Sequence, residues 1–69
     1  MTATTSDFRV TERNNETDAL IRVVAVMSGV TIQQAAAVEE ESIAADGNHI
    51  RLERWNVSHD GETCGWEYL

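Results

Sequence analysis

A single helix-type segment stands between two pairs of strand-type segments, and this order constrains the fold more than any other feature of the sequence. The helix signal is the run Thr31-Ile32-Gln33-Gln34. It fits a capping box, in which the threonine hydroxyl accepts a hydrogen bond from the Gln34 amide and the Gln34 side chain bonds the threonine amide. A helix is therefore predicted to begin directly after Thr31.

The same helix is predicted to run to about Ala45. Asp46-Gly47 would end it, because a glycine takes the left-handed conformation beyond a helix C-terminus at low cost. A narrow apolar stripe of Ile32, Ala36 and Ile43, flanked by Ala35, is expected to lie against a sheet.

The segments before the helix predict a β-hairpin. Phe8–Arg13 alternates between apolar and polar residues, which is typical of a strand. Asp18–Met27 contains several β-branched residues, which favour a strand. A helix capped by Thr17 is the alternative for that segment.

The segments after the helix predict a second hairpin. His49–Val57 and Glu62–Leu69 are the strands, and Asp60-Gly61 is typical of a two-residue type I′ turn. The predicted fold is α+β, with the order β-β-α-β-β and one helix packed on one face of an antiparallel sheet. We expect a single domain over residues 1–69, frayed at residues 1–6.

A two-residue loop at Asp60-Gly61 determines the register of the last hairpin, because it pairs His59 with Glu62. Paired residues share a face of the sheet. Counting outward, the predicted pairs are Val57 with Cys64, Trp55 with Trp66, Arg54 with Glu67, Glu53 with Tyr68 and Leu52 with Leu69.

Both faces of this hairpin are apolar, whereas the chain offers only one helix to cover them. One face carries Trp55, Trp66 and Tyr68, and the other carries Ile50 and Leu52. An uncovered pair of tryptophans would form a contact site for a partner. Two alternatives remain open, namely a bulge that places the tryptophans under the helix and a homodimer that buries them.

The composition favours binding over catalysis. A chain of 69 residues buries only about 60% of its unfolded surface, which leaves little room for a deep reactive pocket. Cys64 is interpreted as a small buried cysteine, and its spacing to His49 and His59 does not match a metal site. We therefore expect no catalytic residues, no metal and no cofactor.

The net charge of −7 opposes direct nucleic-acid binding and favours a basic partner. Acidity that only keeps the chain soluble is the simpler interpretation. A solvated helix face is the simpler interpretation of Glu40 and Glu41. The functional alternative is that they imitate a row of phosphates together with Asp60 and Glu62.

The single cysteine suggests a reducing compartment. No signal peptide and no membrane span are recognised in the sequence. A cytoplasmic location in a bacterial host cell is therefore the expectation.

A small acidic domain with this element order resembles the miniature inhibitors that phages and mobile elements encode against bacterial defence, the anti-CRISPR proteins in particular. Thr31–Ala35 through Ile43, followed by Gly47–Glu53, is similar to the capped helix and following strand of one type I-F anti-CRISPR. The same pattern is similar to small phage and plasmid accessory domains. The anti-CRISPR resemblance implies binding to a Cas effector, often at a basic DNA-binding surface. The acidic composition and the absence of lysine depart from that relative, so no functional residues are carried over.

The leading hypothesis is a phage-type inhibitor that docks on a basic, nucleic-acid-binding surface of a host protein or ribonucleoprotein complex. Its alternative is a homodimeric structural or assembly module that uses the apolar sheet face. The residues predicted to bind the partner are Glu40, Glu41, Asp60, Glu62, Trp55 and Trp66.

Overall fold

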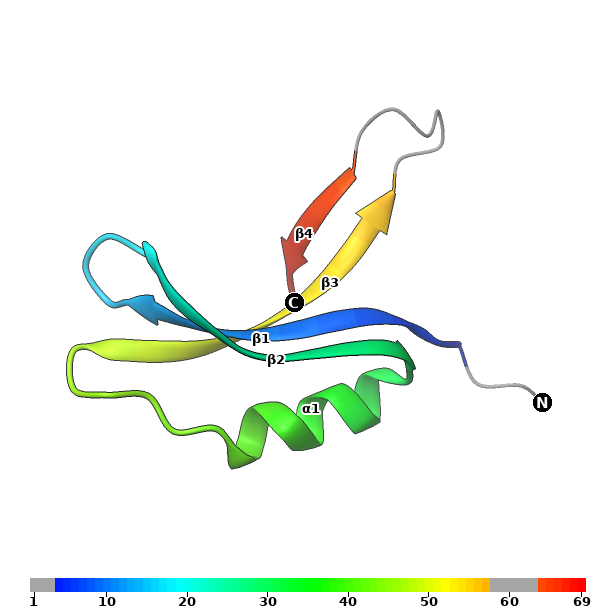
Figure 1. The fold of residues 1–69 in the computed structure, drawn as a ribbon, viewed down its shortest axis with the longest axis horizontal. Helices are drawn as coiled ribbons and strands as arrows, with labels where there is room; N and C mark the ends of the chain where they lie inside the picture. The colour runs from blue at the N-terminus through cyan, green and yellow to red at the C-terminus, as the bar shows by residue number, and fades with distance from the viewer. Residues whose placement is uncertain (1–3, 58–63) are drawn as a thin grey trace.

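The computed structural model describes residues 4–57 and 64–69 and has the expected order of elements (Figure 1). The strands are antiparallel and form one sheet with the order β2-β1-β3-β4. The prediction of an α+β fold with one helix and an antiparallel sheet is therefore confirmed. The elements are β1 (Ser6–Asn14), β2 (Leu20–Val30), α1 (Ile32–Glu41), β3 (Asn48–Val57) and β4 (Cys64–Tyr68).

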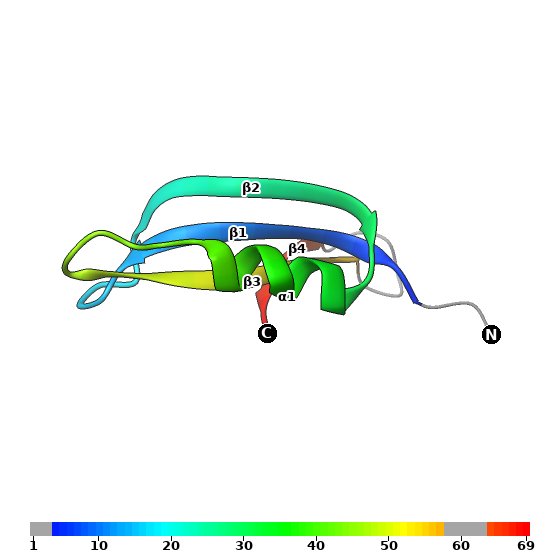
Figure 2. The same ribbon diagram turned by 90° about the horizontal axis from the view of Figure 1, so that it is seen from below.

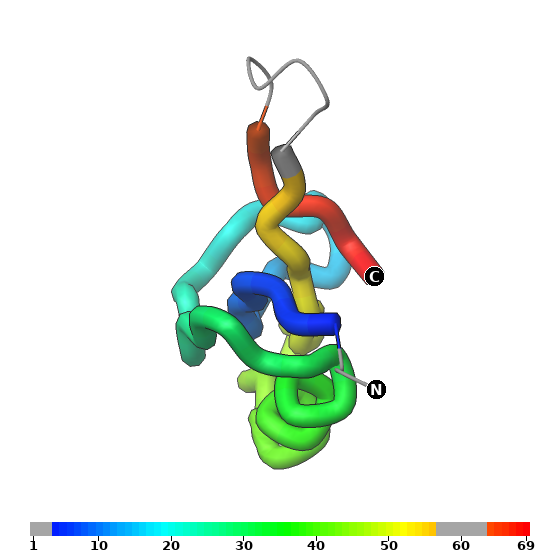
Figure 3. The backbone as a smooth tube through the Cα atoms, turned by 90° about the vertical axis from the view of Figure 1, so that its right-hand side faces the viewer, coloured from blue at the N-terminus to red at the C-terminus, as the bar shows by residue number. Residues whose placement is uncertain are grey.

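The helix covers one face of the sheet, as the view in Figure 2 shows. Its buried contact is Ala35, which packs against Phe8 and Val10 of β1 and Leu52 of β3. An alanine at this point lets the helix backbone lie close to the strands. Seen from the end in Figure 3, α1 lies on one side of the sheet and the β3–β4 hairpin rises on the other.

The ambiguous segment Asp18–Met27 contributes to strand β2, so the strand interpretation is confirmed. Its pairing with β1 is interrupted by bulges, one of which places Val24 as an extra residue between the partners of Val10 and Thr11. The β1–β2 turn is closed by Asn14, whose side-chain oxygen accepts from the backbone amides of the two residues after Asn15.

The start of the helix is as predicted, with both hydrogen bonds of the capping box present at Thr31. The predicted end at about Ala45 is wrong, because α1 ends at Glu41. The Ser42 hydroxyl donates to the Val38 carbonyl at 2.8 Å, and the backbone of Ser42 is already extended. Such a bond from a serine competes with continuation of the helix.

A buried carboxylate holds the chain after the helix in this extended path. Glu12 of β1 accepts from the Ala45 amide at 3.0 Å and from Asn48 Nδ2 at 2.8 Å. Gly47 has the expected positive φ of 83°, but it lies in the turn before β3 and not at the helix end.

The predicted apolar stripe is also wrong in part. Ile43 falls beyond the helix and is 84% exposed, and Ile32 is 47% exposed. Ala35 is the buried helical residue, with Ala36 and Val38 packed beside it. Ile43 leaves the predicted stripe because the last predicted turn of the helix does not form, and Ile32 lies at the exposed first turn.

The register of the last hairpin is confirmed over the described residues. The hairpin turn at Asp60-Gly61 and the His59–Glu62 pair lie outside them. Leu69 N donates to the Leu52 carbonyl, which extends the ladder to the C-terminal residue. The observed pairs include Val57 with Cys64, Trp55 with Trp66, Arg54 with Glu67 and Glu53 with Tyr68.

Candidate partner-binding site

The side of the sheet away from α1 carries most of the large polar and aromatic side chains. Successive residues of a strand point to opposite faces, so the residues next to Val10 and Leu52 point away from the helix. We call this side the open face. It includes Arg9, Thr11 and Arg13 from β1, Arg51, Glu53 and Trp55 from β3, and Trp66 and Tyr68 from β4.

Two indoles meet at one end of the open face. The ring centroids of Trp55 and Trp66 lie 5.1 Å apart in an edge-to-face arrangement. Arg9 lies over the Trp66 ring, with its guanidinium carbon 4.6 Å from the ring centroid. Trp55 remains 37% exposed. The alternative in which a bulge places the indoles under the helix is therefore wrong.

The middle of the open face is organised by one buried carboxylate. Glu53 is 1% exposed and accepts from Arg9 Nη2 at 3.0 Å and Arg13 Nη2 at 3.2 Å. The Thr11 hydroxyl donates to its second oxygen. Burial raises the pKa of Glu53, but the hydrogen bonds from Thr11, Arg9 and Arg13 outweigh it, so the pKa is lowered overall. Glu53 thus holds Arg9 against the Trp66 ring and Arg13 against the Tyr68 ring.

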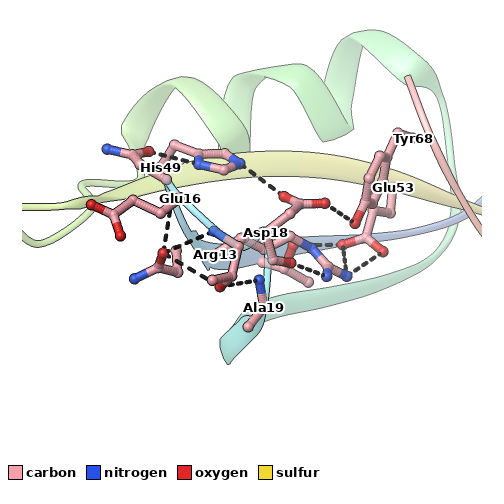
Figure 4. A network of polar contacts seen from close by, with 11 residues as sticks. Arg13, Glu16, Asp18, Ala19, His49, Glu53 and Tyr68 are labelled. Atoms are coloured by element: carbon pink, nitrogen blue, oxygen red, sulfur yellow. Dashed lines mark hydrogen bonds and ion pairs between the residues drawn. The ribbon is translucent and has the colours of Figure 1, made fainter.

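The other end of the open face is a polar network that connects the β1–β2 turn to β4 (Figure 4). The Tyr68 hydroxyl donates to Asp18 Oδ2 at 2.8 Å, which lowers the pKa of Asp18 and raises that of Tyr68. His49 Nε2 lies 3.3 Å from the second oxygen of Asp18. Asp18 has a positive φ of 59°, and Arg13 donates to its carbonyl at 3.0 Å.

The Tyr68 ring is also in contact with two guanidinium groups. Arg51 lies 3.6 Å and Arg13 lies 5.0 Å from its centroid. A guanidinium group stacked on an aromatic ring keeps its N–H groups free to donate hydrogen bonds at the edge of the ring. The open face is therefore a preorganised surface of aromatic rings and arginines.

The predicted partner-binding residues do not all lie together. Trp55 and Trp66 meet on the open face, whereas Glu40 and Glu41 are exposed on α1, on the other side of the sheet. Asp60 and Glu62 lie outside the described residues. One flat contact patch cannot contain both the indoles and the helix carboxylates.

The expected apolar character of the open face is wrong in one respect. β3 and β4 contribute the expected aromatic side chains, but β1 contributes two arginines. The alternation of Phe8-Arg9-Val10-Thr11-Glu12-Arg13 already places Arg9 and Arg13 opposite the apolar side of that strand. What the sequence did not indicate is that β1 lies beside β3, which brings these arginines to Glu53.

Cys64 is exposed at the start of β4, so its interpretation as a buried cysteine is wrong. Gly65 and Trp66 follow it, and the strand ends two residues later. Within residues 4–57 and 64–69, the helix has ten residues and is too short to cross a bilayer.

No protein-family model, curated protein or solved structure matches this chain. Its fold and site define it as a small α+β domain whose sheet has one face covered by a helix and one face lined by aromatic rings and arginines.

Proposed function

We propose that this protein is a small inhibitor-type binding module that docks on a macromolecular partner through Trp55 and Trp66. The observation that carries the proposal is the edge-to-face indole pair on the side of the sheet away from α1, in which Trp55 is exposed and Trp66 is half-buried. Trp, Tyr and Arg dominate the energetics of protein interfaces. All three types meet on the open face, and Arg9 is already held by Glu53. Little side-chain freedom is then lost on binding, which favours affinity.

The proposed partner is a host defence complex with a basic, nucleic-acid-binding surface, a CRISPR effector by resemblance. The net charge of −7 supports attraction to such a surface. The segment from α1 to β3 carries Glu39, Glu40, Glu41 and Asp46 and contains no arginine or lysine. Because these carboxylates lie away from the indoles, we assign them the role of accelerating encounter, while the indoles make the desolvated contact.

The experiment is a competition assay with a purified CRISPR effector ribonucleoprotein and labelled target DNA. The protein is expected to bind the effector and to reduce DNA binding. Trp55→Ala should weaken effector binding by about tenfold or more, which is typical of a hot-spot residue. Ile43→Ala is the matched control, because Ile43 is 84% exposed and lies in the connection between α1 and β3.

Circular dichroism of both variants checks that the fold is kept. The proposal is contradicted if the effector does not bind the protein, or if Trp55→Ala and Ile43→Ala weaken binding equally. If the protein binds the effector but the effector still binds DNA as before, the docking role is retained and inhibition by competition with DNA is rejected.

A further inference from the structure

Strand β2 forms one edge of the sheet and is the longest strand of the fold. It has 11 residues and pairs with β1 on one side. Along its other side no strand lies among residues 4–57 and 64–69, as Figure 2 makes visible. The backbone groups that point outward from this edge are therefore available to another strand.

The side chains of β2 form the largest group of exposed aliphatic residues in the described part of the chain. Leu20, Ile21, Val23 and Val26 are 47%, 52%, 43% and 66% exposed. Natural edge strands are usually protected by lysine, proline, inward-pointing charges or bulges. β2 has bulges in its pairing with β1 but contains no lysine or proline. Arg22 is the one charged residue of β2, and its Nε donates to Glu12 Oε1 at 2.6 Å, so its charge is compensated.

The position of the one charged residue in β2 favours a second copy of this chain as the partner that pairs with this edge. If two β2 strands pair antiparallel around a two-fold axis near Ala25, each Arg22 faces the serine-glycine end of the other strand. The two guanidinium groups are then about 20 Å apart along the ladder, which is beyond the screening length at physiological salt. A strand with a charged residue close to the axis would instead bring two like charges together across the pair.

The small size of the hydrophobic core also favours self-association. Phe8, Val10, Ala35 and Leu52 are the buried apolar residues of the described part. Chains this short often gain stability by forming oligomers. Each pairing across the edge would add backbone hydrogen bonds and bury aliphatic side chains that α1 does not reach.

We propose that two copies of this chain associate through antiparallel pairing of their β2 strands, which joins two four-stranded sheets into one continuous sheet. The two helices then lie on the same side of that sheet. Because β4 forms the opposite edge, the indole pairs remain free at the two ends of the dimer.

Sedimentation equilibrium of the full chain tests the association. The expected mass is twice the 7.7 kDa of one chain. Val26→Lys should weaken dimerisation by about tenfold or more, because the two lysines then lie diagonally across the axis, about 7–8 Å apart, and repel each other. Ile43→Lys is the matched control, since it adds the same charge at a residue that is 84% exposed and lies outside β2.

A wild-type chain that stays monomeric over the whole concentration range overturns the proposal. So does a Val26→Lys variant that is folded and still dimeric, or a dimer that Trp55→Ala dissociates and Val26→Lys does not. Hydrogen exchange of the wild-type chain needs no substitution. Protection of Leu20–Val30 should rise with protein concentration, and exchange independent of concentration overturns the inference.

Discussion

Two buried carboxylates, Glu12 and Glu53, hold the elements of this protein together at the level of single residues. Glu12 bonds the connection after the helix to β1, and Glu53 bonds two arginines of β1 to β3. Glu12 lies on the side of the sheet that faces α1, whereas Glu53 lies on the open face, so the two carboxylates act on opposite sides of the sheet.

The first prediction concerns the charge of Glu53. Glu53→Gln keeps the shape of the side chain but leaves Arg9 and Arg13 without their counter-charge. We expect the free energy of unfolding to fall by about 2 kcal/mol, because the two guanidinium side chains are only 18% and 12% exposed. Urea unfolding at neutral pH measures it. Glu16→Gln, in the exposed β1–β2 turn, is the control, and an equal effect in both variants would reject this role of Glu53.

The second prediction is a loss of stability in acid. Hydrogen bonds from Asn48, from the Ala45 amide and from Arg22 lower the pKa of Glu12 to about 2, whereas an unfolded glutamate titrates near pH ~4.3. A lowered pKa stabilises the folded state above the unfolded value, and this stability is lost as the pH falls toward 2. The urea midpoint should therefore drop between about pH 5 and pH 2.

Glu12→Gln is the comparison variant for this loss of stability in acid. The variant should be less stable at neutral pH and should lose less stability on acidification than the wild-type chain. Part of the dependence of stability on pH should remain in the variant, because the pKa values of Asp18 and Glu53 are also lowered in the folded state. Identical pH profiles for variant and wild type would contradict the assignment to Glu12.

At the scale of elements, the connection from α1 to β3 shows how tertiary contacts change a local pattern. The residues after Glu41 have the composition of a helix, yet Ala45 donates to Glu12 and the chain runs extended to β3. The turn before β3 is closed by a bond from the Asn48 amide to the Ala45 carbonyl, with Gly47 at a φ of 83°.

The third prediction compares two glycines in different elements. Gly47→Ala should lower the free energy of unfolding by about 1 kcal/mol, because an L-residue is strained at that positive φ although no atom lies within 4 Å of the added carbon. Gly65→Ala has the same open space in β4. It should leave stability unchanged or raise it by roughly 0.5 kcal/mol. Thermal unfolding measures both, and the opposite order would contradict the strain argument.

At the scale of the whole molecule, the acidic residues of α1 and the aromatic surface lie on different sides of the sheet. All five arginines belong to strands β1, β2 and β3, whereas the helix and its connection to β3 carry only acidic charges. In the proposed function, the acidic side would attract a basic partner and the aromatic side would anchor it, so the two roles fall to separate surfaces.

The fourth prediction follows from this separation and rests on the proposed partner. Glu40→Gln combined with Glu41→Gln should slow association with the effector and flatten its dependence on salt. Trp55→Ala should instead speed dissociation. Surface plasmon resonance at several salt concentrations separates the two rates. If the glutamine pair changes only the dissociation rate, the carboxylates contact the partner directly and the steering role is rejected.

Much of the fold could be predicted because its signals are local. The capping box at Thr31, the β-branched residues of β2 and the pairing of Trp55 with Trp66 depend on neighbours along the chain or on one hairpin. The extended path after the helix could not be predicted, because it is held by Glu12, which is more than 30 residues away in sequence.

One part of the candidate site could likewise be predicted from the sequence, and another part could not. The indole pair follows from the hairpin register alone, and its place on the uncovered side follows from alternation relative to Leu52. The cluster of Arg9, Arg13 and Glu53 depends on β1 lying between β2 and β3, which no local pattern specifies.

The sequence by itself determined the order of the elements, the register of the last hairpin and the net charge, because each depends on spacing or composition. Only the tertiary structure decided that β1 lies beside β3, that β2 is left at the edge and that the arginines of β1 share a face with Glu53. The physical reason is that non-local pairing is selected by the joint burial of Phe8, Val10, Leu52 and Ala35, and these residues come from three different elements.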